Sequence, residues 1–136
     1  MLNLEKQLCL GVIMHHEISI TNDIACITLE GNLNALDMLF LFQSQEYKSV
    51  ISSYKKILMD YTQISGVSLT SEDIKSLTML SKIELEELGK INMAIVVSDN
   101  ERKTMENVTT FLLAASHANV QVCNSRDNAM KMLNKT

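Results

Sequence analysis

The stretch from residue 56 to about residue 88 constrains the fold of this chain most. An apolar run at 57–59 ends in Asp60, a short polar loop with Gly66 follows, and an amphipathic helix begins near Ser71. A buried strand that leads into a helix N-terminus is the unit of α/β sheets, whose sites lie just past the carboxyl ends of the strands. We therefore predict an α/β fold with functional residues near those ends.

The rest of the chain repeats this alternation of strand and helix around an opening hairpin. The predicted elements are strands 15–21 and 24–30 joined by Asn22-Asp23, a helix from about 33 to 53, strand 91–97, a helix from 98 to about 118, strand 120–123 and helix 126–133. Because helices separate the later strands, those strands should be parallel with right-handed crossovers. We predict a mixed, mostly parallel sheet of four or five strands in one domain (15–136), preceded by an N-terminal extension (1–14).

The composition of the chain excludes or disfavours several classes of protein. The chain has 136 residues, of which 46% are hydrophobic and 21% charged, so it should fold around a real core. Its formal charge of −4 and lack of a basic stripe disfavour nucleic-acid binding. No apolar run reaches the length of a membrane span, and Cys9, Cys26 and Cys123 lie far apart. We expect a cytoplasmic protein with inert thiols and neither cofactor nor metal.

The predicted helix 33–53 carries apolar residues on two sides. One side, expected to cover the sheet, consists of Leu36, Phe40, Tyr47, Val50, Ile51 and Tyr54. Met38, Leu41 and Phe42 lie on the other side. A helix that only covers a sheet does not need a second apolar patch, so these three residues are predicted to form an interface.

Three acidic residues, Glu30, Asp60 and Asp99, follow predicted parallel strands. Because such strand ends share one edge of the sheet, the carboxylates could form a Mg²⁺ or phosphoryl-acceptor site like that of a response-regulator receiver domain. The alternative is that they cap turns and helices, and we favour this second interpretation.

The segment Thr70-Ser71-Glu72-Asp73 opens the second predicted helix. A free helix N-terminus binds anions. Here, however, Thr70 has the position of an N-cap, and Glu72 and Asp73 already place negative charge in the first turn. Phosphate binding is therefore disfavoured. Structural capping is favoured, and a phosphorylation switch or a docking site for a partner is the alternative.

The order of elements and several stretches of sequence resemble the STAS domain, the fold of bacterial anti-sigma factor antagonists and of the cytoplasmic tails of sulfate transporters. The stretches are Ile-Leu-Met-Asp-Tyr-Thr (57–62), Val-Ser-Leu-Thr-Ser-Glu-Asp-Ile (67–74), the apolar run 89–97 followed by Ser-Asp, and Val-Gln-Val-Cys-Asn-Ser-Arg-Asp-Asn-Ala-Met (120–130). The resemblance extends to the SpoIIAA-like relatives of that family and covers about residues 15–134.

This resemblance implies a non-enzymatic regulator. The family signature is Asp-Ser-(Ser/Thr)-Gly with the second hydroxyl phosphorylated by a kinase, and here Thr70, Ser71, Glu72 and Asp73 take those positions, so the motif is degraded. A shift of one residue would make Ser71 the acceptor. The expected partner is a protein such as an anti-sigma factor or a kinase-like regulator, docked through 70–73 and neighbouring loops. The alternative is a SpoIIAA-like carrier or sensor of a small apolar or lipid-like ligand, and the patch at Met38, Leu41 and Phe42 would suit that ligand or a homodimer.

Overall fold

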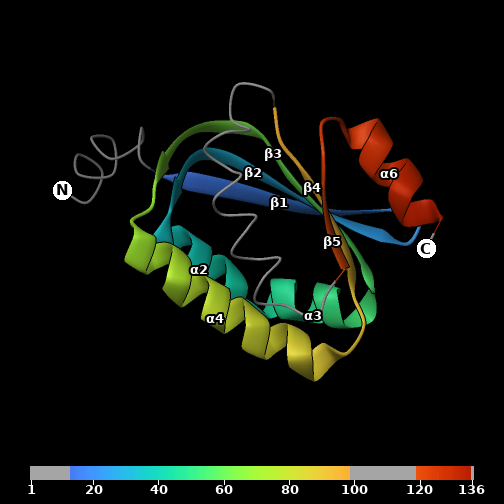
Figure 1. The fold of residues 1–136 in the computed structure, drawn as a ribbon, viewed down its shortest axis with the longest axis horizontal. Helices are drawn as coiled ribbons and strands as arrows, with labels where there is room; N and C mark the ends of the chain where they lie inside the picture. The colour runs from blue at the N-terminus through green and yellow to red at the C-terminus, as the bar shows by residue number, and fades with distance from the viewer. Residues whose placement is uncertain (1–12, 99–118, 136) are drawn as a thin grey trace.

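The computed structural model describes residues 13–98 and 119–135, which form one five-stranded sheet with helices on both faces (Figure 1). The strands lie in the order β1-β2-β3-β4-β5, with β1 antiparallel to β2 and every later neighbour parallel. Their bounds are β1 Met14–Thr21, β2 Ile24–Asn34, β3 Lys56–Ser68, β4 Asn92–Val96 and β5 Asn119–Cys123. The predicted fold class is thereby confirmed.

Four helices belong to the described part of the chain, and the predicted helix 98–118 lies outside it. They are α2 Ala35–Gln43, α3 Gln45–Ser53, α4 Ser71–Leu88 and α6 Arg126–Asn134. Helices α2, α3 and α4 cover one face of the sheet and α6 covers the other (Figure 1). Right-handed crossovers between strands that follow each other across a sheet place their helices on the same face. Helix α6 follows the last strand, so no crossover restricts it to that face.

The opening hairpin forms as predicted. Asn22 and Asp23 adopt positive φ angles of 52° and 64°, the conformation that a two-residue turn requires, and Thr21 pairs with Ile24. This turn sets the register in which β1 lies along β2.

Alternate residues of the central strands enter two separate cores. Ala25, Ile27, Ile57, Met59, Met93 and Ile95 pack toward α2, α3 and α4. Ile24, Cys26, Leu58, Ala94 and Val96 pack toward Ala129 and Leu133 of α6. Burial on both faces explains why these strands appear in the sequence as continuous apolar runs.

The paired strands β2 and β3 are longer than predicted. They continue to Asn34 and Ser68, so Gly66 lies within β3 and not in a loop. The pairing of β2 with β3 shifts register twice along this extension, and at each shift β3 contains one extra residue. Asn32 is buried and donates from Nδ2 to Ser68 Oγ at 2.9 Å. Polar side chains that pair across strands resemble loop composition, which is why the sequence pattern missed them.

The predicted helix 33–53 is two helices that meet at Ser44, where the backbone is extended (φ −68°, ψ 144°). The Ser44 N–H and hydroxyl both donate to the Leu41 carbonyl, and the hydroxyl oxygen accepts from the Tyr47 N–H at 3.2 Å. One serine therefore ends α2 and caps α3. Because of this break, the apolar residues of α2 and those of α3 do not follow one continuous helical period.

The prediction that Met38, Leu41 and Phe42 form an exposed interface is therefore wrong. Their exposed fractions are 5%, 1% and 6%, and all three belong to the core under α2. Leu36, Leu39 and Phe40 are exposed instead, whereas Tyr47 and Ile51 of α3 are buried as expected. The prediction failed because it treated residues 33–53 as one continuous helix, which places Leu36 and Phe40 on the same face as Tyr47.

Candidate functional site

The carboxyl ends of β2 and β3 bring two helix N-termini to one edge of the sheet. Asn34 and Ser68, the last residues of these strands, are paired, and α2 and α4 begin at Ala35 and Ser71. We call residues 34–37 and 70–73 the α2/α4 edge. The predicted docking segment lies on it.

The start of α4 is a closed capping box. Thr70 Oγ1 accepts from the Asp73 N–H at 3.1 Å, and Asp73 Oδ2 accepts from the Thr70 N–H at 2.9 Å. These bonds use donors that an external anion would otherwise bind. Thr70, Ser71 and Glu72 are exposed, so Ser71 presents its hydroxyl at the first helical position.

The start of α2 is also capped by side chains, which the sequence pattern did not reveal. Asn34 Oδ1 accepts from the Asp37 N–H at 2.9 Å, while Asp37 Oδ2 accepts from Asn34 Nδ2 at 2.7 Å and from the Met14 N–H at 2.8 Å. The Asn-x-x-Asp spacing was the available signal. Each helix start therefore carries its own aspartate in the first turn, which disfavours an external phosphate at this edge.

Exposed apolar side chains begin at this edge and continue along α2. Leu36, Leu39 and Phe40, which we call the α2 patch, are 61%, 40% and 63% exposed. Leu36 belongs to the first turn of α2, next to Asp37 in the sequence. Neighbouring apolar side chains that are exposed together mark a candidate interaction surface.

We expect Thr70→Ala to lower the free energy of unfolding by about 1 kcal/mol, because it removes the acceptor for the Asp73 N–H. Urea unfolding of the variant beside Ser71→Ala measures this loss. Ser71 is exposed and does not cap the helix, so its replacement should change stability by less than about 0.5 kcal/mol. Equal losses would contradict the placement of the cap.

The acidic site that we had considered and disfavoured is not assembled by the residues that the structure describes. Glu30 and Asp60 lie within β2 and β3, several residues before the strand ends, and Asp99 lies outside the described residues. Glu30 is exposed and pairs in register with Gln63, not with Asp60. Across residues 13–98 and 119–135, no group of three or more His, Cys, Asp or Glu side chains could hold a metal ion.

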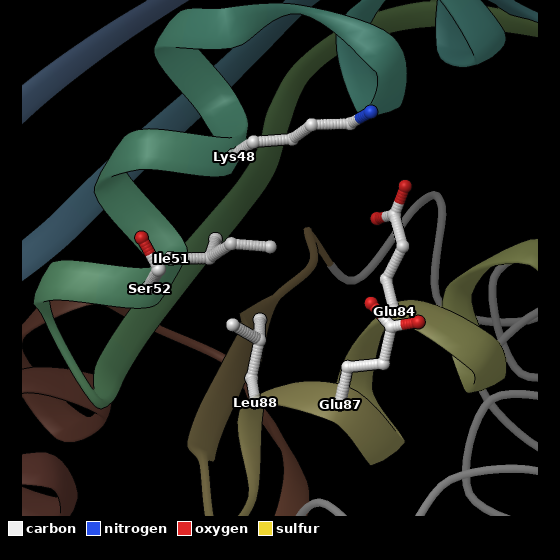
Figure 2. Close-up of a pocket in the computed structure, with 6 residues that line it drawn as sticks. All are labelled: Lys48, Ile51, Ser52, Glu84, Glu87 and Leu88. Atoms are coloured by element: carbon white, nitrogen blue, oxygen red, sulfur yellow. The ribbon is translucent and has the colours of Figure 1, made fainter.

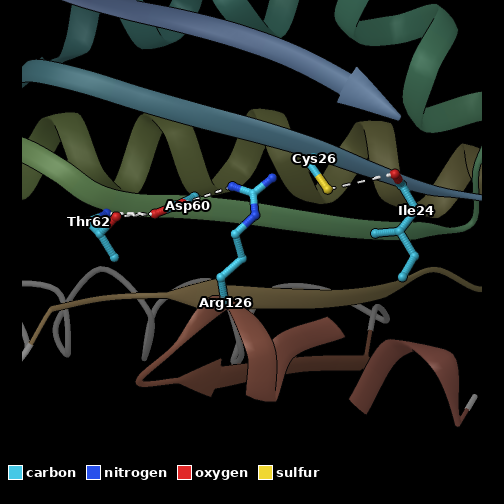
Figure 3. Close-up of polar contacts among 5 residues, drawn as sticks. All are labelled: Ile24, Cys26, Asp60, Thr62 and Arg126. Atoms are coloured by element: carbon cyan, nitrogen blue, oxygen red, sulfur yellow. Dashed lines mark hydrogen bonds and ion pairs between the residues drawn. The ribbon is translucent and has the colours of Figure 1, made fainter. Parts of the chain in front are cut away.

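Asp60 instead holds α6 against the sheet (Figure 3). The Asp60 side chain is 8% exposed. Its Oδ1 accepts from the Thr62 N–H and hydroxyl at 2.9 and 2.6 Å, and its Oδ2 accepts from Arg126 Nη1 at 3.1 Å. Arg126 is the first residue of α6. The carboxylate therefore has a structural role.

We expect Arg126→Met to cost about 1.5–3 kcal/mol of stability, because it leaves the buried Asp60 carboxylate without its cationic partner. Lys131→Met, an exposed change on the same helix, should cost less than about 0.5 kcal/mol. Urea unfolding compares the two. A double variant with Asp60→Asn should lose less than the sum of its single changes, and additive losses would show that the pair is not coupled.

Neither of the two thiols that the structure describes belongs to the α2/α4 edge. Cys26 is buried and its Sγ lies 3.8 Å from the Ile24 carbonyl oxygen (Figure 3). Cys123 is half-buried, and this burial raises the pKa of its thiol, which lowers its reactivity. Cys9 lies outside the described residues.

A cavity of about 290 Å³ opens between α3 and the last turns of α4 (Figure 2). Ile51 and Leu88 form its apolar part, and Lys48, Glu84 and Glu87 form its charged rim. Partial burial raises the pKa of the Glu84 carboxyl, Lys48 lowers it and Glu87 raises it. A second cavity of about 30 Å³, lined by residues including Tyr61 and Phe42, holds water-sized molecules at most.

The Glu84 carboxyl should make stability fall as the pH rises above about 4.5, its usual pKa, toward its raised folded-state value. In that range the unfolded chain releases the proton while the folded chain still holds it, so the unfolded state binds fewer protons. Glu84→Gln should flatten this part of the curve, whereas Glu17→Gln, at an exposed position of β1, should not. Urea unfolding from pH 4 to 7 tests this, and an unchanged curve in Glu84→Gln would contradict it.

The hairpin, the mostly parallel sheet and the helices on both faces define an α/β domain of the STAS/SpoIIAA-like fold. An anti-sigma factor antagonist from Mycobacterium paratuberculosis matches 90% of this chain and 95% of its own, with a TM-score of 0.64 and 11% identity. An uncharacterized protein with a SpoIIAA-like fold from Shewanella loihica matches 88% of this chain and 93% of its own, with a TM-score of 0.53 and 16% identity. At these identities the likeness shows the fold.

Comparisons of the amino-acid sequence with protein families and with curated proteins identify no relative. No family model matches the chain, and no curated protein does either. Among the helices that the structure describes, none is long and apolar enough to cross a membrane.

Proposed function

We propose that this protein is a non-enzymatic regulator that binds a protein partner through the α2/α4 edge and the α2 patch. The observation that carries the proposal is the exposure of Leu36, Leu39 and Phe40 beside two acidic helix starts. Protein interfaces combine a buried apolar and aromatic centre with a charged rim. Here Phe40 and Leu36 would supply the centre, and Glu72 and Asp73 part of the rim. The fold shared with an anti-sigma factor antagonist supports a regulatory role of this kind.

Ser71 is the proposed switch on this surface. Its hydroxyl lies at an exposed helix start, next to Glu72 and Asp73. A phosphate there would gain from the helix dipole but would add roughly two negative charges to an edge that is already acidic. Phosphorylation would therefore change the affinity for a charged partner without changing the fold. Phosphate incorporation by the native host's extract that is lost in Ser71→Ala would support this role.

Photo-crosslinking in the native host tests the docking surface. A benzophenone amino acid at Leu36 should capture a distinct protein, whereas the same group at Gln121, an exposed residue of β5, should not. With the captured protein purified, Phe40→Ser should weaken binding at least tenfold, or about 1.4 kcal/mol. Ile20→Ser, at another exposed apolar position, should leave the affinity unchanged. Equal capture at both positions, or equal affinities, would refute the docking surface.

A carrier of a small ligand is the second candidate, favoured by the 290 Å³ cavity beside α3. Its charged rim suits a small amphiphile better than a purely apolar lipid. Native mass spectrometry of the protein from its host would show a copurifying small molecule. Ser52→Trp, which places a large ring at the exposed rim of this cavity, should remove that molecule if the cavity binds it.

A further inference from the structure

Strand β1 forms an edge of the sheet that no other strand of the described chain extends (Figure 1). Its eight residues, Met14–Thr21, pair with β2 without a register shift, whereas β5 at the opposite edge has only five. Natural proteins protect long edge strands with proline, lysine or a bulge, and β1 has none of these. An open edge of this kind is suited to pairing with another strand.

The backbone groups of β1 alternate between residues that bond to β2 and residues that face outward. The Ile13 carbonyl accepts from the Asn32 N–H of β2 at 3.1 Å. The next N–H along the chain, that of Met14, points away from β2 and donates to Asp37 Oδ2 at 2.8 Å. Within residues 13–98 and 119–135, no strand pairs with the outward groups that follow in this alternation. These groups belong to His16, Ile18 and Ile20.

The outward groups are placed so that β1 can pair with itself. They are centred on Ile18, bounded on one side by Met14, whose N–H is already bonded, and on the other by the turn that begins at Asn22. An antiparallel copy of β1, related by a two-fold axis at Ile18, would set Ile18 against Ile18 and His16 against Ile20 of the second copy. All the outward groups would then be paired in roughly six backbone hydrogen bonds, two for each pair of residues.

The side chains of β1 suit the same register. Ile20 is 44% exposed, and His16 of the second copy would cover it, next to Ile18, which already packs against the core. On the other face of the strand, Glu17 would lie opposite Ser19, an uncharged hydrogen-bond donor. Moving the axis to Glu17 would instead place two carboxylates opposite each other, which destabilises a strand pair. The charges of β1 therefore favour the axis at Ile18.

We infer that β1 pairs antiparallel with β1 of a second copy across a two-fold axis at Ile18, which joins the two sheets into one. This inference goes beyond the proposed function, because the contact uses neither the α2/α4 edge nor the α2 patch. The contact is one strand wide, so the dimer is weak, with a dissociation constant in the micromolar range.

Sedimentation equilibrium of the full-length protein from micromolar to millimolar concentration measures this association. Ile20→Pro removes an N–H that faces the second copy and leaves the bonds to β2 in place. It should raise the dissociation constant of the dimer at least tenfold. The matched control, Ile20→Val, keeps the N–H and should leave the constant unchanged. Far-ultraviolet circular dichroism shows whether both variants keep the fold.

Disulfide trapping tests the register without a proline. In a Cys9→Ser, Cys123→Ser background, where Cys26 is fully buried, a Glu17→Cys protein is mixed with a Ser19→Cys protein and oxidised glutathione. Opposite residues of a non-hydrogen-bonded pair have Cα atoms about 4.5 Å apart, a distance that a disulfide spans. The mixed disulfide should form at least tenfold faster than the disulfide between two Glu17→Cys chains.

Four results would overturn the inference. A monomer at every concentration would show that β1 does not pair with a second copy. Equal dissociation constants for Ile20→Pro and Ile20→Val would remove the outward backbone groups from the interface. A dimer lost in Phe40→Ser but kept in Ile20→Pro would place the contact on the α2 patch. Trapping that is as fast between two Glu17→Cys chains as in the mixture would exclude the axis at Ile18. The photo-crosslinking test at Leu36 does not involve β1, so either proposal can fail without the other.

Discussion

Replacing Phe42 by alanine should lower the free energy of unfolding by about 3–5 kcal/mol, whereas Phe40→Ala should change it by less than about 0.5 kcal/mol. The two side chains are chemically identical and lie two residues apart on α2. Phe42 is 6% exposed and contacts the Tyr47 ring with centroids 5.3 Å apart, while Phe40 is 63% exposed. Removal of the Phe42 ring would lose this contact and leave a cavity between α2 and the sheet.

Urea unfolding of both variants measures this difference, with near-ultraviolet circular dichroism to confirm that each keeps its packing. A larger loss of unfolding free energy in Phe40→Ala than in Phe42→Ala would show that α2 has the orientation expected of one continuous helix. It would also remove the α2 patch on which the proposed docking function depends. This pair is therefore the most informative stability experiment on the chain.

Gly31→Ala should cost about 2–4 kcal/mol, because Gly31 has a positive φ of 90° and a Cβ there would lie 2.4 Å from the Ile13 carbonyl oxygen. That oxygen accepts the hydrogen bond from Asn32, so the clash would break the contact that holds the start of β1 to β2. The backbone atom cannot move aside as the end of a flexible side chain could.

Gly89→Ala is the matched control for this change. Gly89 ends α4 with a φ of 83°, but a Cβ there would meet no atom within 4 Å. Its replacement should cost only the strain of a non-glycine residue at φ 83° and ψ −142°, about 1–3 kcal/mol, without an added steric contact. The difference between the two variants in urea unfolding isolates the steric contact at Gly31. Equal losses would show that the close approach of Ile13 does not exist in solution.

The architecture could be predicted because its signals are local. The Asn22-Asp23 turn has positive φ angles, Thr70 and Asp73 close the capping box, and Gly89 ends α4, each as the sequence indicated. Runs of apolar residues identified the central strands through their burial on both faces. These features depend on neighbouring residues, which the sequence shows directly.

The candidate site was predicted only in part. The helix start at 70–73 was located correctly, but the partner helix start at Asn34 and Asp37 was missed. The apolar surface was assigned to Met38, Leu41 and Phe42, when Leu36, Leu39 and Phe40 are the exposed side chains. Its role in docking remains a prediction, as does the regulatory role of Ser71.

The sequence by itself determined the alternation of strands and helices, the hairpin turn and both ends of α4, because each depends on the conformational preferences of a few adjacent residues. Tertiary structure decided the rest. Whether Ser44 interrupts a helix, which side of α2 meets the sheet and whether Asp60 pairs with Arg126 depend on contacts between distant segments. Such contacts change the free energy by several kcal/mol, more than the local preferences that a sequence pattern records.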